Sequence, residues 1–76
     1  MAKTCPIANR IRDFRESRGQ MSQQDLADAI GVTRQTIHAI ETRKYSPSLE
    51  SAFRIALTFG VKLEDVFNWD GNAVDG

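Results

Sequence analysis

Residues 22–42, with the sequence SQQDLADAIGVTRQTIHAIET, constrain the fold of this 76-residue chain more than any other segment. Ser22, followed three residues later by Asp25, is typical of a capping box that begins a helix, and Thr33 is a second N-cap residue. Gly31 supplies the permissive backbone that a tight turn requires. Apolar residues at helical spacing follow the two caps: Leu26, Ala27 and Ile30, then Ile37 and Ile40. The segment therefore predicts two short helices joined by a tight turn.

Three further helices are predicted around this pair. Helical spacing of apolar residues predicts a first helix over residues 7–18, ended by Gly19. A fourth helix begins near Ser48 and ends at Gly60, and a short fifth helix covers residues 64–67. We expect the fourth helix to bury five apolar side chains: Leu49, Ala52, Ile55, Ala56 and Phe59. Because no segment alternates as a β-strand does, the predicted fold class is all-α, a compact domain of five short, crossed helices.

The length of the chain is sufficient for one domain. A domain of this size buries about 60% of the surface that its unfolded chain exposes. We predict an N-terminal arm over residues 1–6, a domain over residues 7–67 and a C-terminal tail over residues 68–76. The single cysteine excludes an internal disulfide, and no apolar stretch is long enough for a membrane span or a signal peptide. These features predict a cytoplasmic protein.

Charge is distributed unevenly although the formal net charge is zero. Residues 1–44 carry eight basic and five acidic side chains, a net charge of +3, whereas residues 45–76 carry two and five, a net charge of −3. A basic half can approach phosphates while an acidic half maintains solubility. The zero net charge therefore does not argue against a nucleic-acid partner.

Residues that support catalysis are scarce. The chain has one histidine, one cysteine and scattered carboxylates, which provide no nucleophile–base pair, no metal-ligand set and no glycine-rich phosphate loop. We therefore expect that the protein is not an enzyme and that it uses no cofactor, metal ion or small-molecule ligand.

The helix that follows Thr33 is predicted to carry a polar side suited to base edges. Two helices joined by a tight turn commonly place the second helix in the DNA major groove. Arg34 can donate two parallel hydrogen bonds to guanine, and Gln35 can match adenine, each worth about 1–3 kcal/mol of discrimination. His38 lies one turn beyond Arg34 on the same side. The alternative for Arg34 is a phosphate contact without sequence readout.

Residues at both ends of this motif are predicted to contact the DNA backbone. Gln23 lies in the first turn of the second helix, where backbone amides can face a phosphate, although by residue type alone it would be a solvated surface glutamine. Arg43, Lys44 and Tyr45 follow the third helix and can contact sugar–phosphate, or can form a solvated charge pair beside a packed tyrosine. The full predicted DNA-binding set is Gln23, Thr33, Arg34, Gln35, Thr36, His38, Arg43, Lys44 and Tyr45.

Arg15 and Glu41 are predicted to form a structural ion pair between the first and third helices. Arg15 lies beside Phe14, and Glu41 flanks the inward stripe of the third helix. A partly buried pair adds little net stability but is costly to break by removing one partner. We expect Glu41→Ala to weaken folding more than it weakens phosphate contact.

An apolar patch beside the main stripe of the fourth helix predicts a dimer interface. Phe53 and Leu57 lie there, and with Phe67 and Trp69 they can form a surface for a second copy of the chain. The alternative is that Trp69 and the tail fold back over the patch.

These residues together resemble the Cro-type, lambda-repressor-like helix-turn-helix regulators, also called the xenobiotic-response-element family. The resemblance spans about residues 7–67. The matching stretches are SQQDLA (22–27), GVTRQTI (31–37), IE (40–41), SL (48–49), IA (55–56) and FGV (59–61). The resemblance implies a five-helix domain whose second and third helices dock on operator DNA, usually as a dimer on a palindromic site. It also supports the pairing of Arg15 with Glu41.

The resemblance assigns roles to particular residues. It implies that Gln23 matches the family's glutamine at the start of the second helix and that Arg34 and Gln35 occupy base-reading positions. Arg43 departs from the pattern because many relatives have glycine there, and Ala39 stands where some relatives carry a base-contacting polar residue.

The sequence thus predicts a small transcriptional regulator, a repressor that binds double-stranded DNA as a homodimer. The alternative is an antitoxin-like or adaptor protein that uses the same fold to bind a protein partner.

Overall fold

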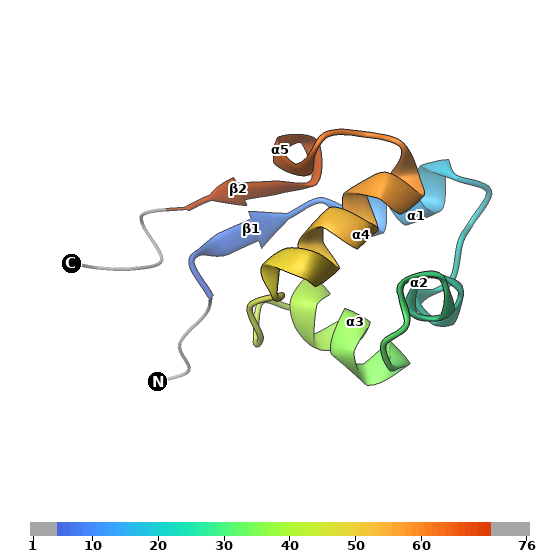
Figure 1. Ribbon diagram of the computed structural model, residues 1–76, viewed down its shortest axis with the longest axis horizontal. Coiled ribbons are helices and arrows are strands. Elements are labelled where there is room, and N and C mark those ends of the chain that lie inside the picture. Colours follow the sequence, from blue (N-terminus) through green and yellow to red (C-terminus); the bar gives the residue numbers. More distant parts are fainter. Residues whose placement is uncertain (1–4, 71–76) are drawn as a thin grey trace.

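The computed structural model describes residues 5–70. Over this range the chain forms five short helices and two strands of three residues each (Figure 1). In chain order these are β1 (Ile7–Asn9), α1 (Ile11–Ser17), α2 (Gln23–Ile30), α3 (Arg34–Glu41), α4 (Leu49–Phe59), α5 (Leu63–Val66) and β2 (Phe67–Trp69). The predicted compact all-α domain of five helices is confirmed, and the two short strands are a minor addition. None of the helices in this range has the length and apolarity needed to cross a membrane.

Side-chain caps begin the three longest helices at the predicted residues. The Ser22 hydroxyl accepts from the Asp25 N–H, and the Asp25 carboxylate accepts from the Ser22 N–H, which completes a capping box. Thr33 accepts from the Thr36 N–H at the start of α3, and Ser48 caps α4 in the same way. Each cap of this kind contributes about 1 kcal/mol. The N-terminal boundaries of α2, α3 and α4 were therefore predictable from single residues.

The prediction of a helix over residues 7–18 is wrong at its beginning. Residues 7–9 form β1, which pairs antiparallel with β2 in the register Ile7↔Trp69, Ala8↔Asn68 and Asn9↔Phe67. Helix α1 begins only at Ile11. Three residues are too few for a visible alternation, and their partner strand lies at the other end of the chain, so local periodicity does not reveal the strand.

The predicted arm and tail are only partly described. Pro6, in the predicted arm, accepts through its carbonyl from the Asp70 N–H at 2.7 Å, and Trp69, in the predicted tail, belongs to β2. These contacts bring the two ends of the described chain side by side, as β1 and β2 in Figure 1. Residues 1–4 and 71–76 lie outside the described residues.

The core is apolar and draws on every helix. Its buried residues are Ile11, Leu26, Ala27, Ile30, Ile37, Ile40, Ala52, Ile55, Ala56, Phe59, Val66 and Phe67. Leu49, expected to point inward, is instead 69% exposed. It lies in the first turn of α4 at the edge of the buried stripe, so it points away from the core. The inward stripe of α3 is confirmed, since Ile37 and Ile40 are both buried.

Arginine occupies an unusual backbone position at the end of α3. Arg43 has a φ of +62°, its N–H donates to the Ile40 carbonyl, and the Lys44 N–H donates to the Ala39 carbonyl. This is a Schellman ending, in which the left-handed position is normally glycine. Gly31 and Gly60 take the equivalent positions after α2 and α4. The left-handed conformation is therefore the physical reason to expect glycine at the position that Arg43 occupies in this chain.

The side chain of Arg43 joins the loop after α3 to both ends of the described chain. Its Nε and Nη2 donate to the Cys5 carbonyl at 3.0 and 2.7 Å, and its Nη1 lies 3.3 Å from Asp70 Oδ2. The Cys5 N–H in turn donates to the Arg43 carbonyl at 2.9 Å. These contacts offset the strain of the left-handed backbone, which is about 1–2 kcal/mol for a residue with a side chain.

Comparing Arg43→Ala with Arg43→Gly separates these two effects. Both substitutions remove the guanidinium, but only glycine relieves the left-handed strain. We expect Arg43→Gly to be more stable than Arg43→Ala by about 1 kcal/mol in urea unfolding. Equal stability of the two variants would show that the backbone at this position is unstrained.

Candidate nucleic-acid interface

The outward side of α3 is polar and carries no acidic side chain. Arg34, Gln35 and His38 are exposed on it, opposite the buried isoleucines. The single acidic residue of this helix, Glu41, is engaged in an ion pair with another helix. An exposed surface that combines hydrogen-bond donors with positive charge suits a polyanion.

A mostly buried ion pair fixes α3 to the scaffold. Arg15 Nε lies 2.7 Å from Glu41 Oε2 and Arg15 Nη2 lies 3.1 Å from Glu41 Oε1, a two-pronged contact. The two side chains are only 12% and 8% exposed. The remaining nitrogen, Nη1, donates to the Met21 carbonyl at 2.8 Å, just before α2. Arg15 therefore links α1, the start of α2 and the end of α3, and the two residues predicted to pair are in contact.

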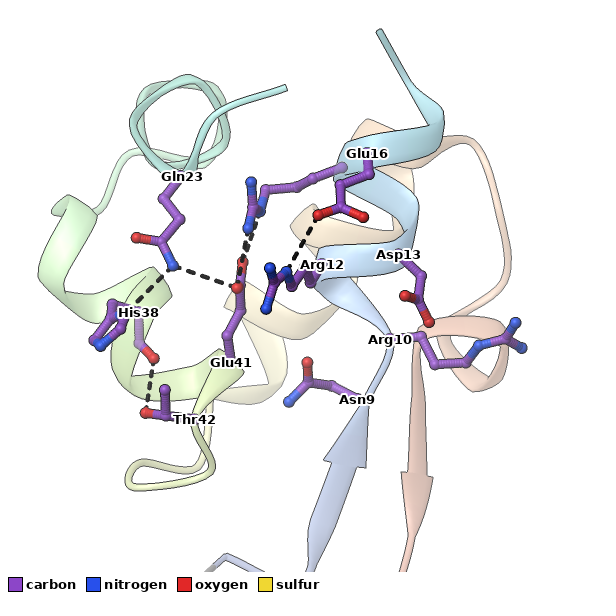
Figure 2. Close-up of a pocket in the computed structure, with 10 residues that line it drawn as sticks. Asn9, Arg10, Arg12, Asp13, Glu16, Gln23, His38, Glu41 and Thr42 are labelled. Atoms are coloured by element: carbon purple, nitrogen blue, oxygen red, sulfur yellow. Dashed lines mark hydrogen bonds and ion pairs between the residues drawn. The ribbon is translucent and has the colours of Figure 1, made fainter. Parts of the chain in front are cut away.

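Gln23 connects this ion pair to the outward side of α3. Its Nε2 lies 3.3 Å from Glu41 Oε1 and 3.3 Å from His38 Nδ1 (Figure 2). Its Oε1 accepts from Arg34 Nη1, also at 3.3 Å. The glutamine predicted to contact a phosphate is therefore bonded to three side chains of α3. These bonds could not be predicted from the sequence, because they depend on how α2 packs against α3.

A polar cleft of about 480 Å³ opens between α1, α2 and α3 (Figure 2). Its lining is Asn9, Arg10, Arg12, Asp13, Arg15, Glu16, Gln23, His38, Glu41 and Thr42. At its outer edge Arg12 is paired with Glu16 at 3.2 Å, and both side chains are largely solvated. The exposed Arg12 of α1 therefore lines the same cleft as His38 of α3.

The remaining predicted DNA contacts divide into exposed and structural residues. Lys44 and Tyr45 are exposed after α3. Thr33 and Thr36 hold their hydroxyls 2.9 Å apart at the start of α3, where Thr33 is the cap. The contact of Arg43 with the DNA backbone stays a prediction. The Arg43 guanidinium is mostly covered and bonded to Cys5 and Asp70.

One feature of the predicted apolar patch needs correction. Phe67 is only 8% exposed and belongs to the core, because β2 turns its side chain inward. Trp69 is 66% exposed and leaves Leu57 76% exposed, so the described part of the tail does not cover α4. Phe53 is also exposed. Leu49, Phe53 and Leu57 are spaced four residues apart, and together they form an exposed stripe along α4, here called the α4 stripe.

Asn9 is a structural residue that sequence analysis missed. Its Nδ2 donates to the Ile40 carbonyl at 2.9 Å, and its Oδ1 accepts from the Ile11 N–H at 3.2 Å. It therefore ties the end of α3 to the start of α1. Asparagine favours helix starts, so its preference for capping could have indicated the boundary of α1 but not the contact with α3.

Comparison with known proteins identifies a matching family model and several related chains. Residues 11–66 match a family model described as helix-turn-helix. An uncharacterized HTH-type transcriptional regulator of Methanocaldococcus jannaschii is 50% identical over 64 residues, which are 84% of this chain and 96% of the relative. A similarly described regulator of Archaeoglobus fulgidus is 45% identical over 70 residues, covering 92% of this chain and 99% of the relative.

A repressor and a solved structure extend the comparison. The cryptic phage CTXphi transcriptional repressor of Vibrio cholerae is 31% identical over 69 residues, which are 91% of this chain but 61% of the repressor. The crystal structure of a Bacteroides fragilis protein, itself proposed to bind DNA, matches with a TM-score of 0.70 and 26% identity. That match covers 82% of this chain and 98% of the other.

Glu41→Ala tests the ion pair. The substitution leaves the Arg15 guanidinium buried without its counter-charge, so we expect a loss of about 3 kcal/mol in the free energy of unfolding from urea melts. The double variant Arg15→Met/Glu41→Met removes both charges and should recover much of this loss. Unchanged stability of Glu41→Ala would contradict a structural role for the pair.

Proposed function

Since the chain belongs to the helix-turn-helix family, we propose that it is a sequence-specific DNA-binding transcriptional regulator that inserts α3 into the major groove. The observation that carries the proposal is the exposed, acid-free side of α3, held by the ion pair of Arg15 and Glu41. A recognition helix needs such a surface, because base edges are read by side chains that stand clear of their own protein.

Base contacts are proposed for Arg34, Gln35 and His38. All three are exposed on one side of α3, and Arg34 and Gln35 lie in its first turn. That turn enters the groove first in helix-turn-helix complexes. Arg34 uses one Nη1 hydrogen on Gln23, which leaves its other donors for a guanine.

Phosphate contacts are proposed for the two ends of the motif. Lys44 and Tyr45 are exposed where the chain leaves α3, and the first backbone amides of α2 lie at the positive end of that helix. Thr33 and Thr36 are proposed as minor contacts through their paired hydroxyls. These contacts add affinity without sequence discrimination.

We further propose that the regulator is a non-enzymatic repressor located in the cytoplasm. The name of the Vibrio cholerae relative supports repression, and the sequence supports the other two features. A protein that covers an operator can repress simply by excluding other proteins from that DNA.

A homodimer is proposed to form through exposed apolar surface. The α4 stripe offers three large side chains, and Leu49 borders a shallow groove lined also by Ile7, Leu63 and Phe67. Trp69 borders an adjoining groove that shares these three residues. Contiguous exposed apolar surface commonly marks an interface. Two copies related by a two-fold axis would place their α3 helices about 34 Å apart, in successive major grooves.

The same apolar surface supports the alternative of an antitoxin-like or adaptor protein. In that case a different polypeptide would cover the α4 stripe, and the outward side of α3 would have no DNA partner. The two functions are separated by whether the protein binds duplex DNA.

Arg34→Ala and Lys44→Ala test the division between base and phosphate contacts. Against duplexes selected from a random pool, we expect Arg34→Ala to lose about 1–3 kcal/mol of discrimination at one base pair. Lys44→Ala should weaken binding to all sequences alike and reduce the salt slope by about 1. Fluorescence anisotropy at several salt concentrations measures both effects.

Arg54→Ala is the matched control for this experiment. Arg54 is also an exposed arginine, but it lies on α4 and pairs with Glu50 at 2.7 Å. Its loss should leave DNA affinity unchanged. The proposed function is wrong if the unsubstituted protein binds no duplex at low salt, and the division of roles is wrong if Arg34→Ala and Lys44→Ala behave alike.

Leu57→Glu tests the proposed dimer. A carboxylate in the centre of an apolar interface is desolvated without a partner, so the dimer dissociation constant should rise by at least about tenfold. Thr58→Glu adds the same charge at the neighbouring exposed position, outside the α4 stripe. This control should change the dimer dissociation constant little. Sedimentation equilibrium measures both, and a chain that is monomeric before substitution would contradict the dimer.

A further inference from the structure

The ring of His38 is held by an interaction that determines where its proton resides. Neutral histidine carries one hydrogen, on either Nδ1 or Nε2, and the nitrogen without it can only accept. In this chain His38 Nδ1 faces Gln23 Nε2 at 3.3 Å. The location of the proton therefore depends on which end of the Gln23 carboxamide faces the ring.

Two neighbours determine the orientation of that carboxamide. Arg34 Nη1 is always a donor, and it lies 3.3 Å from Gln23 Oε1. Glu41 Oε1 accepts, because this carboxylate is paired with Arg15, and it lies 3.3 Å from Gln23 Nε2. Exchanging the oxygen and nitrogen of Gln23 would set donor against donor at Arg34 and acceptor against acceptor at Glu41. Only one orientation satisfies both neighbours.

The amide nitrogen of Gln23 must therefore face His38. An amide nitrogen only donates, and its two hydrogens suffice for one bond to Glu41 and one to His38. Nδ1 of His38 must accept the second bond, which leaves the hydrogen of the neutral ring on Nε2. Figure 2 shows Gln23 between these two side chains of α3.

We propose that Glu41, acting through Gln23, fixes the tautomer of His38 so that the ring presents Nε2–H to the DNA as a hydrogen-bond donor. This inference rests on the proposed function, since it specifies the chemistry of one contact in the groove. Glu41 and Gln23 are then positioning residues, and His38 is a specificity-determining one.

The donor restricts which base edges His38 can read. In the major groove, guanine offers N7 and O6 as acceptors, adenine offers N7 and thymine offers O4, whereas cytosine offers only the N4 amino donor. A ring that presents Nε2–H favours a guanine, adenine or thymine edge and disfavours a cytosine edge. The opposite tautomer would present an acceptor and favour an amino group.

The tautomer can be measured in the free protein, without DNA. Long-range ¹H–¹⁵N correlation spectra distinguish a protonated Nε2 from a protonated Nδ1, and His38 is the only histidine of the chain. Recorded at a pH where the ring is neutral, they should show hydrogen on Nε2. A neutral ring with hydrogen on Nδ1 would overturn the proposal.

Gln23→Glu tests the origin of the tautomer. A carboxylate at position 23 can only accept, so Nδ1 of His38 should gain a hydrogen, either by a change of tautomer or by protonation of the ring. Gln24→Glu is the matched control, since it adds the same charge at the next residue, which is exposed and bonded to Asp28. It should leave the hydrogen on Nε2. If Gln23→Glu is folded by circular dichroism and still shows an acceptor Nδ1, Gln23 does not control the ring.

Two substitutions of His38 test the consequence for base recognition. The amide nitrogen of glutamine reaches about as far as Nε2 of histidine, whereas that of asparagine reaches only as far as Nδ1. In selections from random duplexes, His38→Gln should keep the preference at the base pair that His38 contacts. His38→Asn should lose about fivefold, which corresponds to one hydrogen bond.

The outcomes separate this inference from the proposed function. If the unsubstituted protein binds no DNA, the proposed function fails and the spectra of the free protein still decide the tautomer. If it binds DNA and His38→Asn keeps the same preference at every base pair, the proposed donor is wrong while the function stands.

Discussion

The mostly buried ion pair of Arg15 and Glu41 is the interaction on which the rest of the surface depends. It joins α1 to the end of α3, and the third guanidinium nitrogen of Arg15 extends it to the chain before α2. Asn9 fixes the same end of α3 through the Ile40 carbonyl. Because a buried charge without its partner is strongly unfavourable, this arrangement allows α3 few alternative positions.

The same ion pair also organises the outward side chains, since Gln23 bonds to Glu41 and then to Arg34 and His38. Side chains held in this way before binding lose less conformational freedom when they meet a partner. The glutamine at the start of α2 therefore has a second role besides any contact of its own with phosphate. Because Gln23 bonds to the fixed Glu41 carboxylate, it restricts the positions of the exposed Arg34 and His38 side chains.

Hydrogen bonds between residues close in the sequence make much of the fold predictable. Three helix starts are indicated by N-cap residues that bond to backbone groups three residues on, and all three caps are present: Ser22, Thr33 and Ser48. The strand at residues 7–9 and the covered guanidinium of Arg43 were not predictable, because each depends on a partner far away in the sequence. For the candidate site, sequence indicated which residues lie outward on α3, whereas the bonds of Gln23 became apparent only from the packing of α2 on α3.

The brevity of α3 limits how much information one subunit can extract from a genome. Eight residues rise about 12 Å, which is the height of three to four stacked base pairs. A site of this length recurs by chance about every hundred base pairs, so a single subunit could not specify one position in a genome. Two such half-sites at a fixed spacing would specify a longer sequence. The geometry that holds two subunits together would then contribute to specificity as much as the base-contacting residues do.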